Sequence, residues 1–142
     1  MENTDNLSLL HTLFRCSHSL HMAQKYRGQS RLLILLLENG TLTQRELIEI
    51  TGRRSATLSE QLENMENSGY VTRKANEADK RNVDVTLTSS GHKVAEDAYA
   101  ARAQLADSVF SEYTEDEKRQ LSQFLEEIRQ KLEIIISQQE GN

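Results

Sequence analysis

The sequence contains no proline, six glycines and one cysteine among its 142 residues. Because proline breaks helices and glycine weakens them, this scarcity allows long uninterrupted helices and favours an α-rich fold. The single cysteine, Cys16, excludes an intramolecular disulfide, which fits a reducing compartment. A chain of this length is typical of one domain. We therefore expect residues 1–142 to form a single domain.

Long apolar runs are also missing. The longest, residues 32–37, has six residues, whereas about 20 are needed to cross a bilayer. We therefore expect no contact with a membrane and a cytoplasmic protein. The charged fraction of 27% and the net charge of −5 argue against a disordered chain. An acidic chain gives no global sign of nucleic-acid binding, so that function has to follow from local features.

Hydrophobic periodicity predicts six helices. They are expected at residues 7–24, 32–37, 43–52 and 54–68, from Ser89 onward, and from Thr114 to the C-terminal end of the sequence. Two of them begin with a capping box, in which a threonine is followed three residues later by a glutamate, Thr43 with Glu46 and Thr114 with Glu117. Ser89 is expected to cap the alanine-rich fifth helix.

Between the fourth and fifth helices the hydrophobic period changes to two. Residues 70–73 and 83–88 predict two strands, joined by the polar loop 74–82. Two short helices joined by a tight turn and followed by a hairpin are the parts of a winged helix-turn-helix. The expected fold class is mainly α with a two-stranded β-wing. The winged helix-turn-helix would span residues 28–90, with helical regions at 5–25 and 89–140.

The second helix of such a pair enters the major groove of DNA. Its buried stripe, Leu58, Leu62 and Met65, leaves other positions facing outward. These outward positions are Arg53, Ala56, Thr57, Glu60, Glu63 and Asn64. The start of the helix, Arg53, Arg54 and Ser55, is placed for phosphate contacts because a helix N-terminus offers free N–H groups.

The hairpin tip carries two cations, Lys80 and Arg81. An arginine there is suited to a flanking minor groove, whose width it senses. Asp79 is expected to support the wing by holding Arg81 or the hairpin through a charge-assisted hydrogen bond.

Residues 79–91 resemble the wing signature of the MarR family of bacterial regulators. The pattern is Asp-x-Arg, then alternating apolar residues, then Leu-Thr-x-x-Gly. Residues 43–47 and 62–73 resemble the same family's helix-turn-helix and its exit into the wing. The resemblance covers about residues 28–95. It adds Thr43, Gln44 and Arg73 to the DNA-binding candidates.

This resemblance implies a homodimer in which the first and the last two helices of each chain interlock. The alanine-rich helix and the apolar C-terminal stripe independently favour a partner chain, because one thin protomer can hardly bury both. The dimer would place two recognition helices on a pseudo-palindromic operator in double-stranded DNA. We expect a repressor that a small molecule or an oxidant releases from DNA; activation in place of repression stays open.

The charge of the predicted DNA-binding region departs from the family pattern. Many members carry an arginine where this sequence has Glu60, and residues 43–84 hold seven basic against eight acidic side chains. Affinity would then depend on the cations at the helix start and the wing tip. Glu60 would accept from a cytosine amine or reject wrong bases. The alternative is a dimeric helical interaction scaffold whose winged domain no longer binds DNA.

The first helix gathers Cys16 and three of the four histidines, His11, His18 and His21. On a helical wheel Cys16 lies far from His18, so the cluster cannot form one site on one helix. We assign no metal, although a metal or haem site with ligands from elsewhere stays open. Cys16 resembles, in helix position only, the reactive thiol of the family's peroxide-sensing branch, whose aromatic neighbours are missing here.

Ligands of the family commonly lie between the dimerisation helices and the DNA-binding region. The resemblance therefore gives five effector candidates, Cys16, His18, His21, Arg31 and His92. No nucleophile, base and orienting group can be assembled from the sequence, so we expect no enzyme activity and no cofactor.

Overall fold

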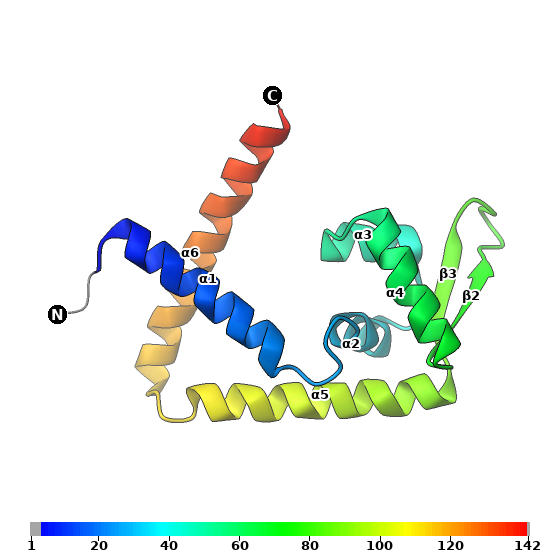
Figure 1. The fold of residues 1–142 in the computed structure, drawn as a ribbon, viewed down its shortest axis with the longest axis horizontal. Helices are drawn as coiled ribbons and strands as arrows, with labels where there is room; N and C mark the ends of the chain where they lie inside the picture. The colour runs from blue at the N-terminus through cyan, green and yellow to red at the C-terminus, as the bar shows by residue number, and fades with distance from the viewer. Residues whose placement is uncertain (1–3, 142) are drawn as a thin grey trace. The chain divides into compact units, whose positions relative to one another are not determined.

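The computed structural model describes residues 4–141. By its internal contacts the chain divides into two compact units, residues 1–105 and 106–142, and each is described by itself. The elements in chain order are α1 (Asn6–Ala23), α2 (Ser30–Asn39), β1 (Leu42–Thr43), α3 (Gln44–Thr51), α4 (Ser55–Asn67), β2 (Val71–Ala75), β3 (Val83–Leu87), α5 (Ser89–Phe110) and α6 (Glu115–Glu140) (Figure 1). The mainly helical winged fold is confirmed, whereas the single domain over 1–142 stays a prediction.

Both predicted capping boxes are present. The hydroxyl of Thr43 accepts from the N–H of Glu46, whose carboxylate accepts from the N–H of Thr43. Thr114 and Glu117 repeat the arrangement at the start of α6. The prediction for α5 was wrong by one residue, because the hydroxyl that accepts from the Gly91 N–H at 3.0 Å belongs to Thr88. A cap has to reach the N–H three residues ahead, and Ser89 is already the first helical residue.

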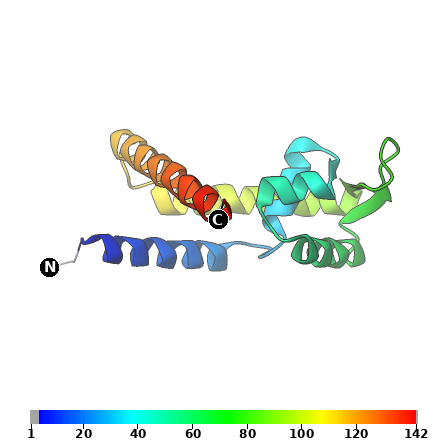
Figure 2. The ribbon, with the colours of Figure 1, turned by 90° about the horizontal axis from the view of Figure 1, so that it is seen from above.

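The sheet has three strands rather than the expected two. Its order is β1-β3-β2, and both pairings are antiparallel. β1 adds the pairs Leu42 with Val85 and Thr43 with Asp84. A strand of two residues is too short to show an alternating pattern, which explains why the sequence did not reveal it. The hairpin β2–β3 projects beyond α3 and α4 in both views (Figures 1 and 2).

The core lies within the first unit, where α2, α3, α4, the hairpin and the start of α5 meet. Its buried members are Leu32, Leu33, Leu36, Leu47, Leu58, Leu62, Met65, Val71, Val85 and Ala95. The predicted stripe of α4 is among them. Because that stripe faces inward, the opposite face of α4 is left to solvent.

Apolar side chains remain exposed on two helices outside this core. α1 has no buried residue, although Leu10, Phe14 and Leu20 lie on it. α6 in the second unit likewise has none, and Ile128 and Leu132 are among its exposed residues. Within residues 4–141, no helix combines the length and apolar character required to span a bilayer.

Candidate nucleic-acid interface

The helix-turn-helix consists of α3 and α4, joined at Gly52, whose φ of 67° lies in the left-handed region. Glycine adopts this conformation without steric cost, which permits the tight turn. Arg54 takes the N-cap position of α4, but its side chain makes no capping hydrogen bond. The first N–H groups of α4 therefore lie at an exposed helix start without help from that side chain.

The predicted outward face of α4 is exposed. Ser55, Ala56, Thr57, Glu60, Glu63 and Asn64 are all solvent-accessible. The face thus presents hydroxyl, methyl, amide and carboxylate groups, a set that can distinguish base edges in a major groove. At the start of α3, Thr43 uses its hydroxyl for the cap and Gln44 is half-buried.

Arg53 is half-buried and already has hydrogen-bond partners. Its Nη1 donates to the carbonyl oxygen of Gly28 at 3.1 Å and to Oε1 of Gln61 at 2.5 Å. Burial, with a smaller contribution from the nearby Arg31, lowers the pKa of this guanidinium. The expected phosphate contact of Arg53 stays a prediction, and its geometry favours a role inside the protein.

Arg73 is also engaged within the fold. Its Nη2 lies 3.2 Å from Oε1 of Glu66, and its side chain is only 21% exposed. The pair links β2 to the end of α4 and so helps to fix the wing against the recognition helix.

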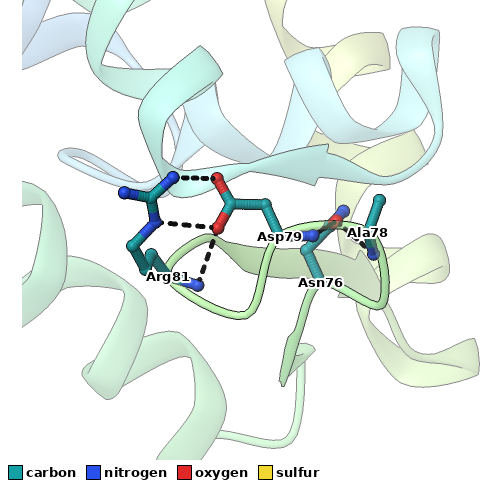
Figure 3. A network of polar contacts seen from close by, with 4 residues as sticks. All are labelled: Asn76, Ala78, Asp79 and Arg81. Atoms are coloured by element: carbon teal, nitrogen blue, oxygen red, sulfur yellow. Dashed lines mark hydrogen bonds and ion pairs between the residues drawn. The ribbon is translucent and has the colours of Figure 1, made fainter.

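The wing tip is organised by short polar contacts (Figure 3). Oδ1 of Asn76 accepts from the backbone N–H groups of Ala78 and Asp79, which closes the turn. Oδ1 of Asp79 accepts from both the backbone N–H and Nε of Arg81, each at 3.1 Å. Both hydrogen bonds lower the pKa of Asp79, and the one from the Arg81 side chain has the larger effect. The expected contact between Asp79 and Arg81 is therefore present.

The two wing cations remain accessible. The Arg81 side chain is 93% exposed despite its contact with Asp79, and Lys80 is exposed as well. Together with the exposed Arg54, they are accessible cations that could meet phosphates or a minor groove.

The five effector candidates are dispersed. Cys16, His18 and His21 are exposed along α1, and His92 is exposed near the start of α5. Arg31 donates to the backbone carbonyl oxygens of Ile50 and Thr51, at the C-terminal end of α3. A cation is favourable there because carbonyl groups give a helix end partial negative charge.

A pocket in the first unit is lined by none of those five residues. Its lining residues are Ala23, Gln24, Lys25, Ser30, Ala98, Ala101, Arg102 and Leu105. Sequence reasoning missed its polar members. The available signal was Arg102 within an alanine-rich helix, since small side chains leave space beside a long one. Within residues 4–141, no three His, Cys, Asp or Glu side chains are grouped to hold a metal.

Comparison with known proteins gives the same fold. The model of the MarR family matches residues 26–82. The uncharacterized HTH-type transcriptional regulator YwhA of Bacillus subtilis is 34% identical over 89 residues, which are 62% of this chain and 63% of that regulator. The HTH-type transcriptional regulator SarZ of Staphylococcus haemolyticus is 32% identical over 105 residues, 70% of this chain and 67% of that protein.

Solved structures extend the likeness over most of the chain. The S. aureus MepR–DNA complex matches with a TM-score of 0.79 and 25% identity, covering 87% of this chain and 97% of MepR. The family model covers α2, β1, the helix-turn-helix and β2, and ends at the residue before β3. The chain belongs to the MarR family of transcriptional regulators.

Proposed function

We propose that this chain regulates transcription by binding double-stranded DNA, with α4 in the major groove and the wing tip at a flanking minor groove. The observation that carries the proposal is the wing. Arg81 is 93% exposed, yet its side chain is held by Asp79. A cation that is both accessible and oriented is suited to a groove lined by phosphates.

The remaining DNA contacts that we propose are assigned mainly from the exposure of side chains. Arg54 and Ser55 at the start of α4, together with Lys80, supply phosphate contacts. Ala56, Thr57, Glu60 and Asn64 on the open face of α4 read base edges. The first helix of such a pair crosses the DNA backbone, which places Thr43 and Gln44 near phosphates.

The functional form that we propose is a homodimer on a pseudo-palindromic operator, acting as a repressor in the cytoplasm. The support is the exposed apolar side chains of α1 and α6, such as Phe14 and Leu132. A second copy of the chain would remove them from water. Two-fold symmetry would then present two recognition helices to two half-sites. Residues 28–90 would bind DNA, and regions 5–25 and 89–140 would form the dimer.

An effector would release the operator by shifting the dimer between two spacings of its recognition helices. The candidates from the sequence remain Cys16, His18, His21 and His92. Arg31 is a weaker one, because its guanidinium already binds the end of α3. We propose no catalytic activity and no cofactor for this function.

The test is the binding of a fluorescent duplex of intergenic DNA from beside the protein's own gene, measured by anisotropy at two salt concentrations. Binding should weaken steeply with salt, because each neutralised phosphate releases counterions. Arg81→Ala should weaken binding strongly. The matched control is Arg119→Ala, an exposed arginine of α6, which should bind as the wild type does.

One observation favours a second candidate, a dimeric scaffold without DNA binding. Glu60 and Glu63 give the recognition helix an acidic exposed face, which phosphates repel. Under this alternative the wild-type protein stays dimeric but binds no duplex even at low salt, and Arg81→Ala changes nothing.

A further inference from the structure

The segment between α1 and α2, residues 24–29, has an unusual backbone. Tyr26 has a φ of 58° and Gly28 a φ of 82°, so two of its residues lie in the left-handed region. For tyrosine this conformation costs free energy and persists only where surrounding contacts impose it. Such contacts exist on both sides of the segment.

On one side the segment is bound to α5. The carboxylate of Asp97 accepts from the hydroxyl of Tyr26 at 2.8 Å and lies 2.6 Å from the ammonium of Lys25. Oε1 of Gln24 accepts from the hydroxyl of Ser30 at 2.7 Å and from Nη2 of Arg102 at 3.4 Å. The ammonium of Lys25 also lies over the Tyr26 ring, 5.4 Å from its centre. The contacts with Asp97 and Arg102 hold the segment, and the strained tyrosine in it, against α5.

On the other side the segment is bound to α4. The single Nη1 of Arg53 joins the carbonyl oxygen of Gly28 to Oε1 of Gln61. The Cα hydrogen of Gly28 that a side chain would replace points toward the Gln61 amide, since a Cβ there would lie 3.7 Å from its Nε2. Both partners of Arg53 are neutral acceptors, so the contact does not cancel the charge of the guanidinium.

We propose that segment 24–29 couples α5 to the recognition helix, with Asp97 and Arg53 as positioning residues for DNA binding. The connection runs from Asp97 through Tyr26 and Gly28 to Arg53 and Gln61, from α5 to the middle of α4. A displacement of α5 along this connection changes the orientation of α4 without any contact between Arg53 and DNA. This inference rests on the proposed function, because it names the contacts that set the orientation of α4 for binding DNA.

The experiment compares neighbouring arginines in full-length protein, using the fluorescent duplex over a series of salt concentrations. Arg54→Gln removes an exposed cation and should reduce the slope of log affinity against log salt by about one. Arg53→Gln and Asp97→Ala should each weaken binding about two- to thirtyfold, with the wild-type slope. The double variant should lose less than the product of the two single losses, because both act on one connection.

Two conservative variants guard against a loss of folding. Tyr26→Phe removes only the hydroxyl that donates to Asp97. Gln61→Met removes the side-chain amide, including the Oε1 that accepts from Arg53, and leaves the carbonyl oxygen of Gly28 as the other acceptor. Each should weaken binding at an unchanged salt slope while the circular dichroism spectrum stays that of the wild type.

Several results would overturn the inference. A slope reduced by about one in Arg53→Gln would make Arg53 a phosphate contact. The coupling would be disproved if the loss of affinity in the double variant equalled the product of the two single losses. It would also be disproved if Tyr26→Phe and Gln61→Met both bound the duplex with wild-type affinity. These outcomes leave the proposed function intact. If wild-type protein fails to bind at low salt, both the function and the inference are wrong.

Discussion

Asp79 binds Arg81 twice through one oxygen, because its Oδ1 accepts from both the backbone N–H and the Nε of the arginine. The spacing of two residues lets one carboxylate fix the turn and the guanidinium together. An exposed ion pair of this kind contributes little to stability. In the proposed complex the pair would orient Arg81 before DNA arrives, which would lower the entropy lost on binding.

Replacing Asp79 should therefore weaken DNA binding without removing a DNA contact. We expect Asp79→Ala to bind the duplex roughly three- to tenfold more weakly, because Arg81 then has to be ordered on binding. The slope of affinity against salt should not change. Glu77→Ala, which removes an exposed carboxylate from the same loop, is the control for altered charge. Equal affinities of the two variants would contradict the orienting role.

Glu60 should affect the choice of sequence more than the total affinity. A carboxylate on the exposed face of α4 can accept from a cytosine amine and repels phosphates elsewhere. Glu60→Gln should bind random DNA more tightly and discriminate between bases at one operator position less well, by about 1 to 3 kcal/mol. Competition with a panel of single-base operator variants measures this. If Glu60→Gln discriminates between the operator variants as the wild type does, Glu60 does not contact a base.

Gly91 is required by packing rather than by its backbone angles. A Cβ at this position would lie 1.8 Å from the carbonyl oxygen of Tyr70. We expect Gly91→Ala to lower the free energy of unfolding by at least about 3 kcal/mol, because the clash is with backbone that cannot rotate away. Thermal unfolding checks this, and exposed Ser90→Ala is the control. A melting temperature close to that of the wild type would show that α5 can shift.

The contact of Asp97 with Lys25 and Tyr26 should make stability depend on pH. Hydrogen bonds from Lys25 and Tyr26 lower the pKa of Asp97 from 3.8. Its stabilising contribution is therefore complete above the unfolded pKa and is lost as pH falls through the folded pKa. The difference in melting temperature between wild type and Asp97→Asn should be greatest near neutral pH and shrink in acid. A difference that stays constant on acidification would rule out this contribution.

The exposed apolar residues of α6 should mediate dimerisation. Wild-type protein should sediment with a mass twice the chain mass of 16.2 kDa. Leu132→Glu should shift it toward the monomer, since a buried unpaired carboxylate opposes association. The exposed Lys131→Glu controls for the change in charge. If the wild type and Leu132→Glu sediment with the same mass, α6 is not part of the dimer interface.

The sequence predicted the winged helix-turn-helix because its signals there are local. Capping boxes, the buried stripe of α4 and the alternating residues of β3 each depend on neighbours a few residues away. The Leu-Thr-x-x-Gly pattern marked Gly91, but its reason, the carbonyl of Tyr70, appears only in three dimensions. The partners of Arg53 and Arg73 were equally invisible, since Gly28 and Glu66 reach them through tertiary packing.

Thr43 is both the last residue of β1 and the N-cap of α3. The strand that it ends is paired with β3, an arm of the wing, and the helix that it begins is the first of the DNA-reading pair. No loop separates the two parts, so in the proposed complex the protein would set the distance between the groove that the wing reaches and the groove that α4 reads. A duplex with a different interval would have to twist or bend to fit, and the stiffness of base steps that no side chain touches would then contribute to the choice of operator.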